Sequence, residues 1–257
     1  MLEIRSIKQA ETPEFIELLS LVFDLHSEKV KPLFYNDPFY DLDRKWAIFD
    51  RGVMSSILTT VPLHFGIGKA YGIAGVATHP SKRGMGLAST LLSEVMSKSE
   101  KVGEHFGLLF AEDKRLYEGL GFSEIDRVIK GSIISEKRHS PVKPTNIKYI
   151  RECYNNWSEK NPLILKRDDQ RWKFWNYIKK PIEKHRGGYI CIENNIVREA
   201  LFHEPSSSWP VPIRTQWLGL DSMIETLGIP IEKKERHMYL MGKNFQDLPI
   251  MFMTDQF

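Results

Sequence analysis

Only two cysteines, Cys153 and Cys191, occur among the 257 residues of the chain. Two cysteines this far apart form neither a disulfide scaffold nor a closely spaced zinc site, so we expect buried thiols and no metal. No apolar run approaches the roughly 18–20 residues that span a bilayer. Charge of one sign is not in large excess either, because 36 Lys and Arg stand against 33 Asp and Glu. We therefore expect a cytoplasmic protein that binds neither a membrane nor nucleic acid.

The chain is long enough for one large domain or two small ones, and apolar residues make up 42% of it, which is ample for a core. A charged segment with two prolines, residues 137–144, is typical of a linker. We therefore expect one domain at residues 1–138 and a second at residues 145–257.

Apolar periodicity predicts the elements of both parts. In the first part we expect helices at 13–26 and from 87 onward, and strands at 44–49, 52–62, 73–78, 106–110 and 125–134. In the second part we expect helices at 146–158 and 167–180, and strands at 189–193, 196–203 and 237–241. Together the elements indicate an α/β (mixed α+β) fold with a central mixed sheet and helices on both faces.

The segment Val76-Ala-Thr-His-Pro-Ser-Lys-Arg-Gly-Met-Gly-Leu-Ala88 is the most informative part of the sequence. His79-Pro80 ends a strand, and Gly84 and Gly86 then allow backbone conformations in which successive N–H groups point into one concavity. From Leu87 the apolar spacing predicts a helix, whose positive N-terminal end faces the same loop. The segment is suited to hold a phosphate, although an ordinary strand-to-helix turn would use the same residues.

Two other phosphate-binding loops do not fit. No Gly-Lys-Ser/Thr follows the loop, so the nucleoside triphosphatase pattern is absent. The glycines at 66, 68 and 72 also miss the spacing of the dinucleotide-binding fingerprint.

The loop Arg83-Gly-Met-Gly-Leu-Ala88 resembles the Arg/Gln-x-x-Gly-x-Gly/Ala motif of the GCN5-related N-acetyltransferases (GNAT). Downstream, Leu116-Tyr-Glu-Gly-Leu-Gly-Phe122 resembles the second landmark of that family, Tyr-x-x-x-Gly-Phe. The stretch from Trp46 to Phe122 is most similar to the tandem-domain branch of the enhanced intracellular survival acetyltransferases. Arg167-Asp-Asp-Gln-Arg-Trp172 resembles the start of the second domain in that branch, a degenerate GNAT-like domain without its own coenzyme loop.

The resemblance implies an acetyl-CoA-dependent N-acetyltransferase that works by direct attack of an amine, with acetyl-CoA as co-substrate and no metal. The acceptor would be a small-molecule amine or a peptide amine, and a homo-oligomer is an open alternative. The residues implied in coenzyme binding are Val76, Ala77, Thr78, Arg83, Gly84, Met85, Gly86, Leu87, Ala88 and Ser89. A non-catalytic acyl-CoA-binding sensor or scaffold, or an acyltransferase for a longer acyl-CoA, are the alternatives.

Tyr117 is the candidate catalytic residue, because the matching hydroxyl in the family protonates the departing thiolate; the alternative is a tyrosine that packs a short helix on the sheet. The general base is left open among Asp24, Glu112, Asp113 and the Phe257 carboxylate. Trp172 and Trp175 in the aromatic run 171–177 recur at helical spacing, which favours a buried face over a surface that stacks nucleic-acid bases.

Overall fold

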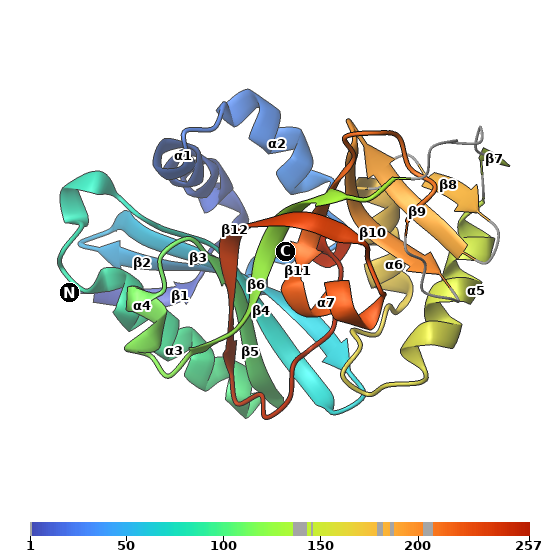
Figure 1. The fold of residues 1–257 in the computed structure, drawn as a ribbon. Coiled ribbons are helices and arrows are strands. Elements are labelled where there is room, and N and C mark those ends of the chain that lie inside the picture. Colours follow the sequence, from blue (N-terminus) through green and yellow to red (C-terminus); the bar gives the residue numbers. More distant parts are fainter. Residues whose placement is uncertain (1, 136–142, 145, 179–181, 186–187, 203–207) are drawn as a thin grey trace.

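The structure is a computed structural model that describes residues 2–135, 143–144, 146–178, 182–185, 188–202 and 208–257. Within these residues twelve strands form one twisted mixed sheet that runs through the molecule, with helices on both faces (Figure 1). The mixed α/β class expected from the sequence is therefore confirmed.

The order of strands across the sheet is β1-β2-β3-β4-β5-β12-β6-β11-β10-β9-β8-β7. The strands are β1 (Leu2–Ser6), β2 (Lys45–Asp50), β3 (Val53–Phe65), β4 (Gly68–Thr78), β5 (Glu104–Ala111), β6 (Ser123–Ile133), β7 (Lys143–Pro144), β8 (Ile182–His185), β9 (Gly188–Glu193), β10 (Ile196–Phe202), β11 (Gln216–Leu220) and β12 (Ile231–Lys243). The α-helices are α1 (Thr12–Phe23), α2 (Ser27–Tyr35), α3 (Leu87–Lys101), α4 (Arg115–Glu118), α5 (Ile147–Ser158), α6 (Asp169–Ile178) and α7 (Asp221–Thr226).

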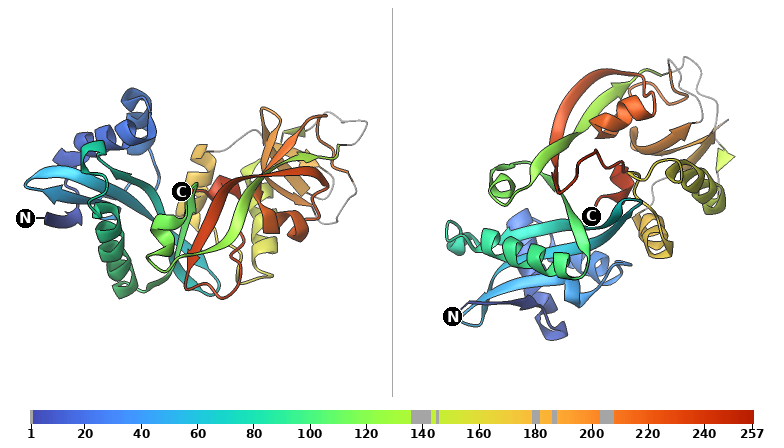
Figure 2. Two further views of the ribbon diagram at one scale, coloured as in Figure 1. Left: turned by 60° about the vertical axis from the view of Figure 1, so that its left-hand side comes forward. Right: turned by 90° about the horizontal axis from the view of Figure 1, so that it is seen from below.

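The first half of the chain places one helix layer on each face of its strands (Figure 2). Strands β1 to β4 are antiparallel neighbours, and α3 then crosses over so that β5 pairs with β4 in parallel. Helix α3 covers one face, and α1 packs on the opposite face through Phe15 and Leu18. The apolar stripe expected on α3 is buried throughout, at Leu87, Leu91, Leu92, Val95 and Met96.

A strand from near the end of the chain lies in the middle of the sheet. Strand β12 pairs antiparallel with β5 on one side and with β6 on the other. The last residues of the chain consequently lie centrally, between the two halves of the molecule (Figure 2). The two halves share one sheet. The expected division into domains at residues 1–138 and 145–257 stays a prediction, and residues 136–142 of the expected linker lie outside the described residues.

The second half of the chain buries its aromatic residues against strands β8 to β11. Trp172 and Trp175 of α6 are 2% and 1% exposed and belong to the same apolar core as Tyr154 and Trp217. The prediction that these tryptophans of the aromatic run face a core is confirmed.

Several sequence-based expectations differ from the structure. The helical spacing of Phe15, Leu19 and Phe23 predicts a buried Phe23, but this side chain is 47% exposed, because α1 ends there and Asp24 turns left-handed. The sixth helix starts at Asp169 rather than at 167, since the Asp168 side chain accepts the N–H of Arg171 and caps the helix. Cys191 is buried as expected, whereas Cys153 is half-buried.

Candidate functional site

The pairing of β4 with β5 ends before β4 does. The parallel ladder runs from Lys69–Glu104 to Ile73–Leu109, while β4 continues beside β3 to Thr78. A bulge interrupts the β3–β4 ladder in this stretch, where Gly75 has a φ of 59°, and bulges bend the strand that carries them. Residues 74–78, which include Val76, Ala77 and Thr78, therefore have no strand partner on the β5 side. The carboxyl end of such diverging strands is where open α/β sheets bind ligands.

Two contacts hold the start of the loop after β4 in place. A 3-10 turn at Pro80–Lys82 is capped by the His79 ring, whose Nδ1 accepts the N–H of Ser81. The Lys82 ammonium then lies 2.8 Å from a carboxylate oxygen of Asp50 at the end of β2. These contacts fix the direction in which the chain enters the glycine loop.

The glycine loop exposes a row of unpaired backbone donors. Gly84 and Gly86 have φ values of 78° and 73°, a left-handed conformation that disfavours other residues. A β-carbon at either position would meet no atom within 4 Å, so space is open above both. In the described part of the chain, the N–H groups of residues 84–89 donate to no partner. The Gly86 carbonyl starts helix α3 by accepting the Thr90 N–H at 3.0 Å.

These features fit a diphosphate. The first turn of α3 directs its unpaired N–H groups and the positive end of its dipole toward the loop. The structure thus brings Arg83, Gly84, Met85, Gly86, Leu87, Ala88 and Ser89 together at one helix N-terminus, directly after the β4 end. Arg83 is exposed and free to turn toward an anion, whereas Leu87 anchors the helix in the core.

Tyr117 lies in the short helix α4, which follows the carboxyl end of β5. Its ring is half-buried against the core under α3 and meets the Phe122 ring edge-on, with centroids 6.4 Å apart. Its hydroxyl makes no hydrogen bond with another described residue. Burial, with a smaller contribution from the negative Asp113, raises the pKa of the Tyr117 hydroxyl above its ordinary value. The hydroxyl therefore stays protonated at neutral pH, as an acid must.

A cavity of about 240 Å³ lies on the other face of β4, under α1 and α2. Ala74 and Gly75 form its wall on the sheet, next to the place where β4 leaves β5. Most of its lining is apolar, including Phe34, Phe39, Phe174 and Phe257, and its charged side chains are Asp37 and Lys45.

The four base candidates lie in different surroundings. Asp24 and Glu112 are exposed. Asp113 accepts the N–H and the guanidinium of Arg115, and these hydrogen bonds lower its pKa to about 2, which makes it a weak base. Phe257 lines the cavity, and its ring packs directly on Gly72 of β4. The identity of the base stays a prediction.

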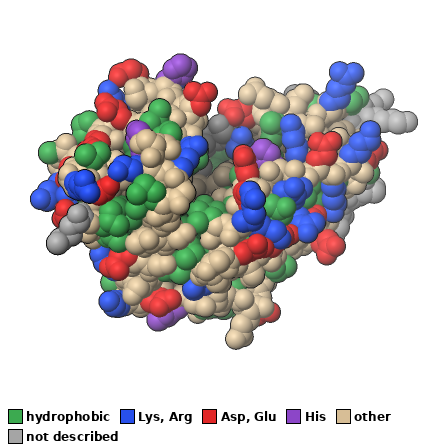
Figure 3. Space-filling model, turned by 90° about the vertical axis from the view of Figure 1, so that its left-hand side faces the viewer, with side chains coloured by type: hydrophobic (Ala, Val, Ile, Leu, Met, Phe, Trp, Pro, Cys, Tyr) green, Lys and Arg blue, Asp and Glu red, His purple; other side chains and the backbone are tan. Residues whose placement is uncertain are grey.

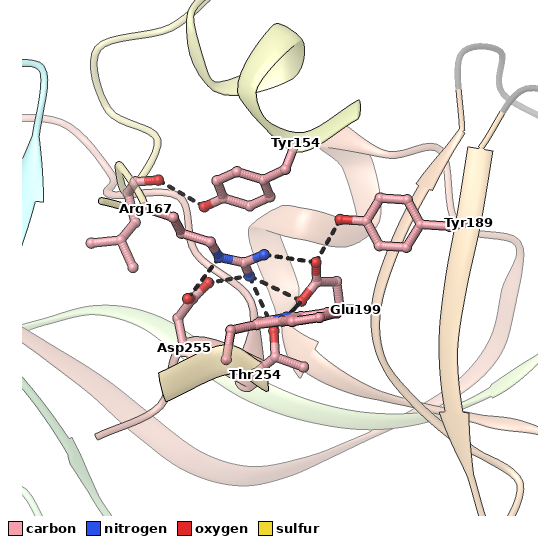
Figure 4. A network of polar contacts seen from close by, with 8 residues as sticks. Tyr154, Arg167, Tyr189, Glu199, Thr254 and Asp255 are labelled. Atoms are coloured by element: carbon pink, nitrogen blue, oxygen red, sulfur yellow. Dashed lines mark hydrogen bonds and ion pairs between the residues drawn. The ribbon is translucent and has the colours of Figure 1, made fainter. Parts of the chain in front are cut away.

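A buried network fixes the residues that precede Gln256 and Phe257 (Figure 4). The Arg167 guanidinium donates to both carboxylate oxygens of Glu199, at 3.0 and 2.9 Å, and to those of Asp255, at 2.9 and 2.6 Å. Glu199 also accepts hydrogen bonds from the Tyr189 hydroxyl, the Trp175 indole N–H and the Thr254 hydroxyl. The Arg167, Glu199 and Asp255 side chains are 0% exposed. Burial raises the pKa of Asp255, whereas Arg167 and the other donors keep the pKa of Glu199 low.

Sequence reasoning missed both this network and Lys45. A signal for Lys45 existed, because strand alternation places it on the same face as Ala47 and Phe49, which pack under α1. A lysine at such an inward position marks a departure from the pattern. Glu199 in an apolar strand, β10, carries a similar signal.

The fold defined by this sheet and loop is that of the GNAT acetyltransferases. A GCN5-related N-acetyltransferase from Kribbella flavida superposes with a TM-score of 0.73 at 16% identity, covering 94% of this chain and 70% of that chain. A putative acetyltransferase from Pyrococcus horikoshii gives 0.66 at 10% identity, covering 98% and 92%. Eis1 from Mycobacterium abscessus gives 0.61 at 10% identity, covering 93% and 73%.

A family model described as acetyltransferase (GNAT) domain matches residues 3–125, just under half of the chain. The match concerns this N-terminal part of the chain, and the solved structures, at 10–16% identity, show the GNAT fold. A search of curated proteins found no match. Its place in the enhanced intracellular survival branch stays a prediction.

Among the residues that the structure describes, no group of three or more His, Cys, Asp or Glu side chains could hold a metal ion. None of the helices there is both long enough and apolar enough to cross a bilayer. On the face in Figure 3, Lys and Arg side chains alternate with Asp and Glu.

Proposed function

We propose that the protein is an acetyl-CoA-dependent N-acyltransferase that acts on an amine bound in the cavity under α1 and α2. The observation that carries the proposal is the row of N–H groups at residues 84–89 at the start of α3, which donate to no described partner and lie beside the open space at Gly84 and Gly86. The GNAT fold and the family match at residues 3–125 support it.

In this reaction, different parts of the chain bind the coenzyme, stabilise the oxyanion and transfer protons. The loop amides hold the coenzyme diphosphate, and backbone groups of Val76 to Thr78 pair with its pantetheine arm in place of a neighbouring strand. Backbone N–H groups of β4 near the bulge stabilise the oxyanion of the tetrahedral intermediate. The amine nitrogen forms a C–N bond to the thioester carbon to give this intermediate, and the C–S bond breaks when the intermediate collapses to the amide. The amine loses one proton to a base or water, and the departing thiolate takes one from Tyr117.

Release of free thiol from acetyl-CoA, measured with and without a panel of amines, tests this function. Thiol release that depends on the amine is the expected result. Tight acetyl-CoA binding without release for any amine would instead favour a sensor or scaffold. A higher kcat/KM with octanoyl-CoA than with acetyl-CoA would favour a longer acyl donor. Absence of both binding and release would contradict the proposal.

A further inference from the structure

Lys45 is a buried lysine that has no anionic partner among the described residues. Its side chain belongs to β2 and faces the cavity under α1 and α2, and the residue is 4% exposed. Among the described residues the ammonium has neither a hydrogen-bond acceptor nor an ion-pair partner. The ammonium lies over the face of the Phe34 ring, whose centroid is 5.0 Å away. Burying an unpaired charge is costly, so proteins pair such groups or neutralise them.

The surroundings of Lys45 do not supply the missing partner. Asp37 lines the same cavity, but one of its oxygens accepts the N–H of Phe39 at 2.8 Å. Burial lowers the pKa of Lys45, and the negative charges of Asp37 and Asp41 oppose this only in part. An anion that entered the cavity would provide both the hydrogen-bond acceptor and the counter-charge.

The remaining lining sets the size and character of the ligand. The cavity volume of about 240 Å³ is below the roughly 300–1,000 Å³ of sites for drug-sized ligands. Phe34, Phe39 and Phe174 make much of the wall apolar, while Ala74 and Gly75 lie where β4 would present the thioester. A molecule that fits this cavity is small and has an apolar side chain. It places an amine toward β4 and an anionic group toward Lys45.

We propose that the acceptor is an amino-carboxylic acid with an apolar side chain, and that Lys45 binds its carboxylate. The inference rests on the proposed function and names the substrate class of the same site. Polyamines and aminoglycosides fit poorly, because several positive charges would approach the Lys45 ammonium in an enclosed, apolar space.

The test compares matched acceptors that differ only in the carboxylate. Acetylation of L-phenylalanine is compared with that of phenethylamine, and acetylation of L-leucine with that of 3-methylbutylamine. The wild-type protein should favour each amino acid in kcat/KM by about 10- to 100-fold, the range of a hydrogen-bonded charge pair. In Lys45→Met this preference should collapse through KM, and Lys45→Arg should restore part of it.

Lys98→Met is the matched control. The Lys98 ammonium also lies over an aromatic ring, 4.6 Å from the centroid of Trp46, but it lines a separate cavity of about 510 Å³. This variant should keep the wild-type preference. Calorimetric titration of each variant with acetyl-CoA shows that the coenzyme site is intact, so a misfolded variant is recognised and excluded.

Three results would overturn the inference. They are a wild-type protein that prefers the decarboxylated amines, a Lys45→Met variant with an unchanged preference, and transfer to neither member of any pair. Thiol release with the wider amine panel separates failure of this inference from failure of the proposed function. Where another amine supports release, only the acceptor class is wrong, and where no amine does, the proposed function fails with it.

Discussion

A substitution in the buried network around Arg167 tests most clearly which contacts stabilise the second half of the chain. Glu199→Gln keeps the side-chain shape but removes one of the two negative charges that face the Arg167 guanidinium. It also places an amide NH₂ group where donors already converge from Trp175 and Tyr189. Removing one partner of a buried ion pair typically costs about 3–5 kcal/mol. Because Asp255 stays in contact, we expect the lower end, about 3 kcal/mol.

For a chain of this size, 1 kcal/mol corresponds to a change in Tm of about 2–4 °C, so Glu199→Gln should lower Tm by about 6–12 °C. Urea unfolding followed by circular dichroism measures the free energy directly. The control is Glu28→Gln, because Glu28 pairs with Lys31 at 2.6 Å but is 81% exposed; its cost should stay below about 1 kcal/mol.

The pH dependence of the Glu199 contribution has a defined sign. Since the pKa of Glu199 is lowered in the folded state, its stabilisation is present above its ordinary pKa and is lost as the pH falls through the lowered value. The cost of Glu199→Gln should therefore shrink in acid. A loss below 1 kcal/mol at pH 7 would show that the network does not stabilise the fold as described.

Two other changes follow from the N-terminal half. Tyr117→Phe should lower kcat by on the order of 10²-fold with little effect on acetyl-CoA affinity, and near-normal turnover of this variant would return Tyr117 to a packing role. Because the pKa of Tyr117 is raised, the activity of the wild-type protein should not decline on the alkaline side below about pH 10. Hydrogen bonds from Arg5 lower the pKa of Glu11 to about 2. Glu11→Gln should therefore destabilise the protein above pH 4.5, and this effect should disappear as the pH falls toward 2. A difference in unfolding free energy between wild type and variant that is constant with pH would contradict the pairing.

The local part of the site could be predicted from sequence because its signals are local. The glycines at 84 and 86 are needed for a backbone conformation, and the apolar stripe from Leu87 to Met96 follows helical periodicity. Both features depend on neighbouring residues alone, and the structure places them as the pattern indicates.

The distant contacts could not be predicted in the same way. Strand β12 inserts between β5 and β6, which lie about a hundred residues earlier in the chain, and no pattern in residues 231–243 specifies those partners. The Arg167 network likewise joins side chains 32 and 88 residues apart. Charged residues in apolar segments, such as Lys45 and Glu199, were the available signal, because an inward charge requires a partner that only the fold can supply.

The central claim is that the loop at residues 83–89 binds the coenzyme diphosphate. Calorimetric titration with a non-hydrolysable acetyl-CoA analogue, comparing wild type with Gly86→Asp and Gly86→Asn, tests it most directly. Both variants impose the same left-handed backbone strain at position 86, so their difference isolates the negative charge. A charge about 4 Å from a phosphate costs between about 1 and 4 kcal/mol, depending on solvent exposure.

The account predicts micromolar binding by the wild type and affinity for Gly86→Asp at least about 5-fold below that of Gly86→Asn. Absence of binding to the wild type, or equal affinities of the two variants, would contradict it. In that case the segment between β4 and α3 is a turn and not a phosphate site.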